Sequence, residues 1–546
     1  MADTRGTRGR VVMVVDNAVR DDSRVQKVAR SAAQAGWEVI LLGRSPTGQP
    51  DGWRLGRAEV RLLPMPEPLH RRRHEFRRAW LRWPLAYPPT GIAEHRAQWV
   101  SAWRADIDSR AARLALAARS GELPARRVSG GRRRLAWESL GARVVGRWVW
   151  ARTKMLNRAR NARRFRGPWD RAYTWFWRTV KGDACWRRLE PGLWDYELAY
   201  GPVIDALEPD LVHAHDFRMI GVGAMAATRA RARARRVALV YDAHEFLPGI
   251  RPWRDHARWL PAHTAYEREF IRYADAVVTV SDDLAEALRR EHGLPERPAV
   301  VLNAPDLASD DDEVGQPPPD IRRLCGVGPE VPLLVYSGNA GAHRGLDTMV
   351  EALPRLAGAH AALVVNRPDG AYVRQLTARA ATLGVADRVH VLPYVPYRQV
   401  VGFLSGADLG VIPVHRWPNY EIAHITKFFE YSHARLPVVV SDLRTMAGTV
   451  RATGQGEVFR ARDVDDYVRA VTAVLADPGR YRAAYERPGM LDGWTWAAQA
   501  EVLDGVYGRL LPDGSRDGGP RDGGPRDGGP RAPAEPAADP ALEVAA

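Results

Sequence analysis

Short apolar runs alternate with helical segments along most of the chain, and this alternation predicts parallel β-sheets. Residues 11–15 (VVMVV) are predicted to form a buried strand, the stretch from Ser23 to Gly36 keeps the apolar period of a helix, and VILLG follows as the next strand. Open parallel sheets bind ligands beyond the carboxyl ends of their strands, so the loop from Asp16 to Asp22 is a candidate acceptor loop. Because no G-x-G-x-x-G follows the first strand, a dinucleotide site is not predicted there.

Later apolar runs in the first half end in polar side chains. These runs are DLVHAHD, VALVYDAHEF, ADAVVTVSDD and AVVLNAPD. The first two deliver His215, Asp242, His244 and Glu245 just after buried strands, where the edge of a parallel sheet carries functional groups. Asp242 and Glu245 flank His244 and are expected to orient its ring. A structural role for His215, as support for the loop, remains the alternative.

A second series of strands and helices begins with VPLLVYSGNAGAHRGLDTMVEAL. A strand, a glycine-containing loop and a helix in that order allow backbone N–H groups and a helix dipole to hold a phosphate. Gly338 and Gly341 permit close approach, Asn339 lies between them, and Arg344 adds a positive charge. An ordinary structural turn is the alternative.

The segment NYEIAHITKFFEYSHARLPVVVSD (residues 419–442) predicts a short helix that leads into a buried strand. Lys427 and Glu430 are three residues apart and share one helical face, whereas Phe428 and Phe429 turn toward the core. The face offers a cation for a diphosphate and a carboxylate that accepts hydrogen bonds from a ribose diol. A solvated helix face is the alternative.

The length of 546 residues allows two or three domains. We predict a first α/β domain over 10–305 with an insertion at 66–195, a linker at 306–330, a second α/β domain over 331–494, a terminal helix at 495–511 that crosses back to the first domain, and a tail at 512–546. The linker prediction depends on SDDDE and PPP, which indicate a solvated hinge and not a metal site. The tail repeats RDGGP three times and is expected to be disordered.

Positive charge is concentrated in the insertion. Residues 71–188 contain 30 Lys and Arg but only 8 Asp and Glu, whereas the whole chain has a formal net charge of +15. They also contain 11 of the 19 Trp. Interleaved Arg and Trp are compatible with amphipathic helices on an anionic membrane, with a helical cap over an acceptor cleft, or, less favoured, with nucleic-acid binding.

Two cysteines, Cys185 and Cys325, are present without a CxxC motif, which argues against a disulfide scaffold and a structural zinc site. The N-terminus lacks the apolar region of a signal peptide, and no apolar run reaches the length of a membrane span. A cytoplasmic protein, peripheral at the inner face of the plasma membrane, is the expectation.

Two stretches resemble glycosyltransferases of family 4. KFFEYSHARLPVVVSD, which begins at Lys427, is similar to the family's "K-[LF]-F-E-Y … PVV.SD" segment, and Asp22, Arg24 and Lys27 match its "D.RV.K.A" pattern. The resemblance covers roughly residues 10–60 and 200–511. It implies the GT-B fold, in which two Rossmann-like domains face a cleft, the first taking the acceptor and the second a nucleotide-sugar donor.

The resemblance also implies roles for single residues. Glu430 is expected to hold the donor ribose, Lys427 and Arg344 the phosphates, and His244 the transferred sugar. Glu421 is a further donor-binding candidate, although it lies one residue farther from Glu430 than the family spacing requires. Either Glu421 or His415 is a candidate to reach the donor sugar.

The implied reaction is transfer of a sugar from a nucleoside diphosphate to a glycan or lipid-linked acceptor, with retention of anomeric configuration. The departing phosphate helps to deprotonate the acceptor, and no Asp-x-Asp metal motif stands at a strand end, so cations are expected to act without an obligatory metal or other cofactor. A GT-B nucleotide-sugar epimerase, or a non-catalytic protein that binds membranes or nucleic acid beside a vestigial nucleotide pocket, are the alternatives.

Overall fold

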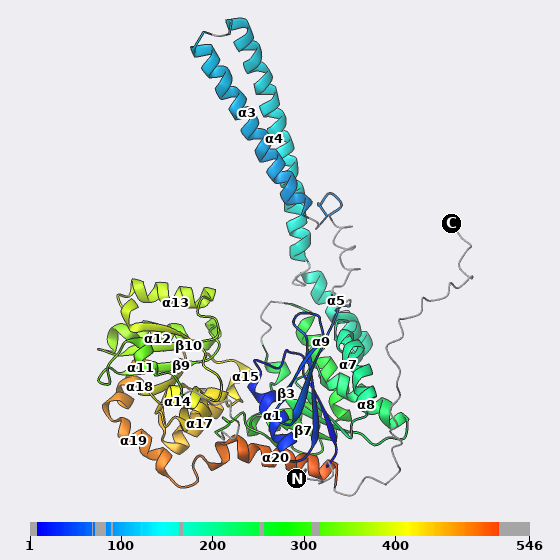
Figure 1. Ribbon diagram of the computed structural model, residues 1–546, viewed down its shortest axis with the longest axis vertical. Helices are drawn as coiled ribbons and strands as arrows, with labels where there is room; N and C mark the ends of the chain where they lie inside the picture. Colours follow the sequence, from blue (N-terminus) through cyan, green and yellow to red (C-terminus); the bar gives the residue numbers. More distant parts are fainter. Residues whose placement is uncertain are drawn as a thin grey trace, which may run out of the picture. The chain divides into compact units, whose positions relative to one another are not determined.

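A computed structural model describes residues 8–67, 69–70, 83–88, 91–121, 123–162, 167–250, 256–307 and 317–512. The RRRHEFRRAW segment, the SDDDE run and the RDGGP tail lie outside these described residues. The first predicted domain contains an eight-stranded sheet in the order β3-β4-β2-β1-β5-β6-β7-β8 (Figure 1). Its strands are β1 (Arg10–Val14), β2 (Glu38–Arg44), β3 (Asp51–Leu55), β4 (Ala58–Leu63), β5 (Leu211–His215), β6 (Ala238–Ala243), β7 (Ala276–Thr279) and β8 (Ala299–Val300).

All neighbouring strands of this sheet are parallel except β3 and β4, an antiparallel pair that the sequence analysis did not predict. Strand β1 is buried on both faces, since Val12 and Val14 belong to one hydrophobic cluster and Val11 and Met13 to another. The helices of this half are α1 (Ser23–Gln34), α6 (Trp186–Leu189), α7 (Leu193–Leu207), α8 (Ile220–Ala232), α9 (Trp259–Phe270) and α10 (Asp282–His292).

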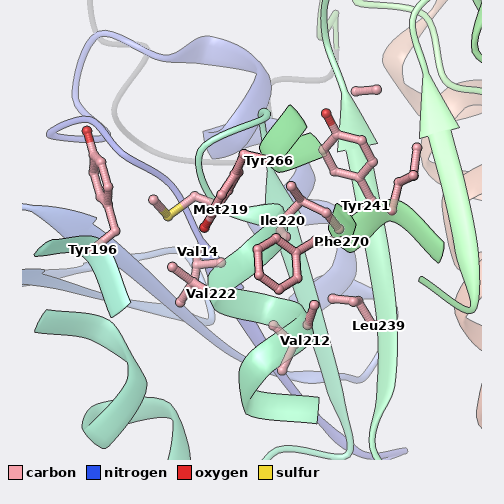
Figure 2. Close-up of a cluster of buried hydrophobic side chains, with 14 of the residues drawn as sticks. Val14, Tyr196, Val212, Met219, Ile220, Val222, Leu239, Tyr241, Tyr266 and Phe270 are labelled. Atoms are coloured by element: carbon pink, nitrogen blue, oxygen red, sulfur yellow. The ribbon is translucent and has the colours of Figure 1, made fainter. Parts of the chain in front are cut away.

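The first of these clusters packs helices α7, α8 and α9 against the sheet (Figure 2). Its larger side chains include Tyr266 and Phe270 of α9, whose rings meet edge to face at 4.9 Å. Tyr241 projects from β6 into the same layer and donates a hydrogen bond to Glu267 at 2.6 Å. This packing holds β5 and β6, whose carboxyl ends carry His215 and His244, in fixed register.

The second half contains a six-stranded, wholly parallel sheet in the order β11-β10-β9-β12-β13-β14. The strands are β9 (Leu333–Ser337), β10 (His360–Val365), β11 (Val389–Pro393), β12 (Leu409–Ile412), β13 (Val438–Ser441) and β14 (Gly456–Phe459). The helices are α11 (Ile321–Cys325), α12 (Leu346–Ala352), α13 (Ala371–Thr382), α14 (Val400–Leu404), α15 (Pro418–Glu421), α16 (Thr426–His433), α17 (Arg444–Thr453), α18 (Val464–Ala476) and α19 (Pro478–Arg482). Helix α11 lies within the predicted linker 306–330, and its Ile321 packs into the core of this half.

Three helices occupy most of the described insertion. They are α3 (Ile92–Arg119), α4 (Ala125–Ala162) and α5 (Pro168–Lys181). Helices α3 and α4 form a long hairpin and lie side by side (Figure 1). Helix α5 packs against the first half, where Asp170 pairs with Arg258 at 3.0 Å. Among the described residues, no helix combines the length and apolarity needed to cross a membrane.

The final helix, α20 (Trp496–Leu510), packs against the first half of the chain. Leu503 and Val506 join the cluster formed by β1, α1 and β2, and the Tyr507 ring meets Trp37 edge to face at 5.8 Å. The Trp37 indole N–H donates to Asp504 at 2.7 Å. The two halves are thus connected a second time, by a helix from the end of the chain.

Candidate active site

Helix α16 presents Lys427 and Glu430 to a cavity of about 1060 Å³ whose walls come from both halves of the chain. Phe428 and Phe429 are buried on the opposite side and fix the rotation of the helix about its axis. The start of the helix is tied to the first half, because the Asn303 amide donates to the Thr426 hydroxyl at 2.8 Å. The face predicted from the sequence is therefore the face that lines the cavity.

The Lys427 ammonium lies beside the loop after β9. Its Nζ is 3.9 Å from the centre of the Tyr336 ring, and a Cβ added to Gly338 would come within 2.3 Å of it. Gly338 has φ +143°, which favours glycine here, and a side chain at this position would displace the Lys427 ammonium. Burial and the Arg344 charge lower the pKa of Lys427 well below its usual range, and Glu430 only partly opposes this. An anionic ligand would favour the charged form of Lys427 and oppose this lowering.

Two lysines from different halves of the chain act electrostatically on Glu430. Burial raises the pKa of the Glu430 carboxyl, whereas Lys427 and Lys27 lower it. Lys27, on α1, donates to Asn303 at 2.9 Å and to the Ala304 carbonyl. Burial and Arg24 lower the pKa of Lys27 to about 7. No described residue makes a hydrogen bond to the Glu430 carboxylate, which leaves its oxygens open to the cavity.

Arg344 ends the turn Ala342–Arg344, and its guanidinium lies 5.1 Å from the centre of the Tyr420 ring. Its Nε is buried without a hydrogen-bond partner in the part of the chain that the structure describes. The following Gly345 has φ +71°, and a Cβ there would collide with the Pro413 carbonyl. The backbone thus fixes a cation whose donors point to the same cavity as Lys427.

The first half contributes a buried cluster centred on Asp242. Both Asp242 oxygens accept from Arg24, at 2.8 and 3.0 Å, and Oδ2 also lies 3.2 Å from His215 Nδ1 and 3.1 Å from His244 Nε2. Burial raises the pKa of Asp242, but Arg24, His244 and His215 outweigh it and hold the pKa well below its usual range. Asp242 is therefore an anion that organises three neighbours.

His244 and Arg24 are the members of this cluster that line the cavity. Burial lowers the pKa of His244, but the Asp242 carboxylate outweighs burial and raises the pKa to about 9. The imidazole is thus protonated at neutral pH and can donate hydrogen bonds but not accept a proton. Glu245, also on the cavity wall, has its pKa raised by burial.

The structure separates the other predicted residues into two groups. Asn339, Asp22, Arg24 and Glu245 line the cavity together with the residues above, although the Asp22 carboxylate also caps α1 by accepting from Val25 N–H. The residues outside the lining are Gly341, Glu421, His415, Asp16, His215 and Asp242.

The side chains outside the lining have other partners. Glu421 accepts from the Arg444 N–H at 2.8 Å, at the start of α17. His415 contacts Arg462 at 3.3 Å, and Asp16 pairs with Arg218. These positions do not bring Glu421 or His415 to the cavity, in contrast to the expectation that one of them reaches the donor sugar.

Sequence reasoning did not assign a site role to three residues that the structure places at or near the cavity. Lys27 was noted only as part of a family pattern, yet it contributes to the electrostatics of Glu430. Tyr394 lines the cavity at the end of β11. Asp216 follows β5 with φ +67°, and burial raises its pKa to about 7. The strand-end position in DLVHAHD was the available signal for Asp216.

Three buried side chains, His213, His215 and Asp242, place ligand-type atoms within 4.8 Å of one another. The guanidinium of Arg24 already engages both oxygens of Asp242, and His213 Nδ1 lies 2.5 Å from the Tyr507 hydroxyl. These contacts do not fit a resident metal, because the Arg24 guanidinium already occupies the Asp242 oxygens that a metal ion would need.

Two parallel-sheet halves that share a cavity are the architecture of the GT-B fold, and comparison with known families adds the activity. Residues 162–309 match the family described as Glycosyltransferase Family 4, and residues 321–488 match Glycosyl transferases group 1. Together the two matches cover more than half of the chain. The chain therefore belongs to the GT-B glycosyltransferases, in agreement with the resemblance to family 4, and it is an enzyme that transfers sugars.

Curated relatives are similar over part of their length. D-inositol 3-phosphate glycosyltransferase 1 of Catenulispora acidiphila is 27% identical over 326 residues, which are 56% of this chain and 73% of the relative. The GDP-mannose-dependent alpha-(1-6)-phosphatidylinositol monomannoside mannosyltransferase of Mycolicibacterium smegmatis is also 27% identical over 326 residues, covering 56% of this chain and 81% of the relative.

Solved structures share the fold at low identity. Sucrose-phosphate synthase of Thermosynechococcus elongatus superimposes with a TM-score of 0.57 at 15% identity and covers 92% of this chain and 99% of that chain. The α,α-trehalose 6-phosphate synthase of Burkholderia multivorans gives a TM-score of 0.53 at 13% identity, covering 92% and 97%. The predicted fold class is thereby confirmed.

Proposed function

We propose that the protein transfers a sugar from a nucleoside-diphosphate sugar to a hydroxyl of a membrane-borne acceptor, with retention of anomeric configuration. The observation that carries this proposal is that two cations, Lys427 and Arg344, line the same cavity as a carboxylate, Glu430, that accepts no hydrogen bond from a described residue. Neither cation makes an ion pair within 4.0 Å of a described carboxylate, so a diphosphate would supply a direct anionic partner.

In this proposal the second half of the chain binds the donor. Lys427 and Arg344 hold the diphosphate, the backbone around Gly338 approaches it closely, and Glu430 accepts hydrogen bonds from the ribose hydroxyls. The curated mannosyltransferase relative is described as GDP-mannose-dependent, which supports a nucleoside-diphosphate sugar as the class of donor. No metal is required by this arrangement.

The chemical step breaks the bond between the anomeric carbon and the diphosphate oxygen and forms a bond from that carbon to the acceptor oxygen. Charge develops on the leaving diphosphate, where Lys427 and Arg344 stabilise it. The acceptor proton passes to the departing phosphate oxygen. Protonated His244 donates to a hydroxyl of the transferred sugar and keeps it oriented, a role that its raised pKa supports.

Two observations support a membrane-borne acceptor. The mannosyltransferase relative is named for a phosphatidylinositol mannoside, a lipid-borne acceptor. The described insertion also exposes several tryptophans beside many arginines, as in helices that lie on anionic lipid. We propose a peripheral position at the inner face of the plasma membrane; nucleic acid is not proposed as a partner.

A thermal-shift panel of nucleoside diphosphates and their sugars tests donor binding directly. One member of the panel should raise the melting temperature of the wild type and not that of Glu430→Ala, because only a ligand of the intact pocket stabilises the fold. Glu421→Ala is the matched control, since that carboxylate lies outside the cavity and its variant should keep the shift. Equal shifts in all three proteins would refute the assignment of Glu430.

Product analysis then separates transfer from the alternatives. Anomeric NMR of a product formed only when an acceptor is present should show the donor's configuration retained. Formation of a new nucleotide sugar without any acceptor would identify an epimerase instead. A third outcome is that the donor binds but is not consumed, even when a membrane-lipid extract is added as a source of acceptor. This outcome would identify a binding protein with a vestigial pocket.

A further inference from the structure

The α3/α4 hairpin has a packing face that is already used. On α4, Val128, Ala142, Val149 and Leu156 are buried and are spaced by seven residues or multiples of seven. A seven-residue apolar repeat is the pattern by which two helices pack along each other. This face of α4 is therefore occupied by α3 and is not free for another partner.

A second apolar stripe runs along the outer side of α4. Trp137, Leu140, Val144 and Trp148 follow one another at spacings of three and four residues, which places them on one side of the helix. Their side chains are 74%, 48%, 59% and 49% exposed. At about 100° per residue, the stripe lies roughly 150° around the axis from the α3-packing face. Contiguous exposed apolar side chains of this kind mark an interaction surface.

The charge of α4 identifies the chemistry of the partner. From Ala125 to Ala162 the helix carries eleven Lys and Arg and a single acidic residue, Glu138, which pairs with Arg110 of α3. Arg133 and Arg147 border the stripe, are exposed and make no ion pair within the described ranges. A second copy of the hairpin would be repelled by this charge, whereas an anionic surface complements it.

The composition of the stripe favours lipid over nucleic acid. In proteins that bind single-stranded nucleic acid, the bases stack on aromatic rings. Leu140 and Val144 would have no role in such binding. At a bilayer, by contrast, aliphatic side chains enter the acyl boundary, Trp rings lie at the headgroup level and Arg contacts phosphate. The stripe and the arginines that border it together supply all three kinds of side chain.

Helix α5 shows the same pattern independently. Its Trp169, Phe176 and Val180 are exposed at positions i, i+7 and i+11, the spacing that Trp137, Val144 and Trp148 have on α4. Arg171 and Arg178 are exposed beside them. The inner face of α5 is anchored by Trp177, which packs against the first core cluster. Two helices of the insertion thus repeat one amphipathic design.

We propose that the outer stripe of α4, from Trp137 to Trp148, docks in the plane of an anionic phospholipid surface. The biological role of this docking rests on the proposed membrane-borne acceptor, because docking would bring the enzyme to that acceptor. The binding itself needs neither donor nor transfer, and so it is tested separately from the reaction.

The test is co-sedimentation of the full-length chain with vesicles of phosphatidylcholine, with and without phosphatidylserine. Wild type should bind the vesicles that contain phosphatidylserine, and Trp137→Ala/Trp148→Ala should lower the partition coefficient by about tenfold or more, since two large apolar side chains leave the interface. Arg133→Gln/Arg147→Gln should weaken binding to anionic vesicles by a similar factor.

Trp150→Ala is the matched control. Trp150 is 62% exposed on the same helix but lies about 140° around the axis from Trp137, so its loss should leave vesicle binding within about twofold. Equal losses in Trp150→Ala and the stripe variant, or no binding of wild type to anionic vesicles, would overturn the proposal. Preferential binding to DNA that requires Trp137 and Trp148 would also overturn it, in favour of nucleic acid.

Sugar transfer to a soluble acceptor analogue separates this proposal from the proposed reaction. The stripe variant should transfer at the wild-type rate in solution, because Trp137 and Trp148 do not line the cavity. Circular dichroism of the same variant should match wild type, since both replaced side chains are exposed. If the protein binds vesicles but transfers no sugar, the proposed docking surface is supported and only the proposed reaction is refuted.

Discussion

The two halves of the chain place charged groups at the ends of parallel strands in opposite ways. Around Asp242, each charge has a protein partner: Arg24 forms two hydrogen bonds to the carboxylate, and His215 and His244 lie within 3.2 Å. Around Lys427, two cations and a carboxylate share a wall without a hydrogen bond among them. In the first cluster the carboxylate is paired at both oxygens, although Nε2 of His215 has no hydrogen-bond partner among the described residues, and the second cluster is incomplete.

The difference teaches which cluster positions and which cluster binds. A satisfied buried network is rigid and loses stability when one member is removed, because the remaining charge is left without a partner. An incomplete cluster is destabilised by burial and gains most from a ligand of opposite charge. We therefore expect substitution of Asp242 to act on folding and substitutions near Lys427 to act on donor binding and turnover.

Replacement of Lys427 should have the largest effect on turnover. Lys427→Met removes a cation that faces the leaving diphosphate, and loss of one such group lowers kcat by about 10²–10³-fold. Initial-rate kinetics with the donor found in the thermal-shift panel measure this. Arg416→Met removes a cation that pairs with Asp442 outside the cavity and should keep turnover within about twofold. Similar losses in both variants would contradict a specific role for Lys427.

Replacement of Asp242 should have the largest effect on stability. Asp242→Asn leaves the buried Arg24 guanidinium without its anion, and breaking such a pair costs about 3–5 kcal/mol of unfolding free energy. Urea denaturation measures it. In a double-mutant cycle, Arg24→Met/Asp242→Asn should lose less than the sum of the single variants. Additive losses would show that the two side chains act independently.

His244 should make stability depend on pH in a defined window. Its pKa is raised to about 9, so folding takes up a proton between about pH 6.5 and 9, and the contribution of His244 is complete below 6.5 and lost as pH rises through 9. The difference in unfolding free energy between wild type and His244→Gln should therefore shrink across that window, by up to about 3 kcal/mol. A constant difference from pH 6 to 9.5 would exclude a protonated His244.

Donor affinity should weaken as pH rises, because Lys427 loses its proton at a lower pH than an ordinary lysine. Its pKa is lowered by burial and by Arg344, and only the protonated amine attracts a diphosphate. Calorimetric titration of the nucleoside diphosphate into wild type and Lys427→Arg compares the two. The Arg variant stays charged and should show a flatter profile, whereas identical slopes would assign the pH dependence elsewhere.

Replacement of Glu421 should have the smallest effect. Its carboxylate accepts from the Arg444 N–H and lies outside the cavity, so Glu421→Ala should lower stability by about 1 kcal/mol, as for loss of a helix cap, and leave kcat/KM within about twofold. Thermal melts and steady-state kinetics check both values. A tenfold loss of kcat/KM at unchanged stability would return Glu421 to the donor site.

The sequence predicted the repeating architecture well because buried parallel strands read as continuous apolar runs. It located Lys427 and Glu430 on one face because three-residue spacing on a helix has only one geometric outcome. It missed the antiparallel pair of β3 and β4, since DGWRL has no apolar run and is held by pairing with its neighbour.

Long-range contacts account for features of the site that the sequence did not predict. The local sequence does not indicate that Lys27 acts on Glu430, because the two residues belong to different halves and are 403 positions apart. The carboxylate of Glu421 caps α17, a contact made with Arg444 beyond the next strand. Spacing within a helix is encoded in neighbouring residues, whereas the approach of two domains depends on the whole fold.

The packing of α20 against the first half has a consequence for synthesis of the protein. Leu503, Val506 and Tyr507 complete a hydrophobic cluster whose other members lie mostly among residues 11–60. A nascent chain that has released its first 305 residues still exposes the surface that α20 covers, and it retains that surface until the second half has emerged. The half that leaves the ribosome first therefore finishes folding last, and truncated chains that end before Trp496 should need a chaperone or aggregate.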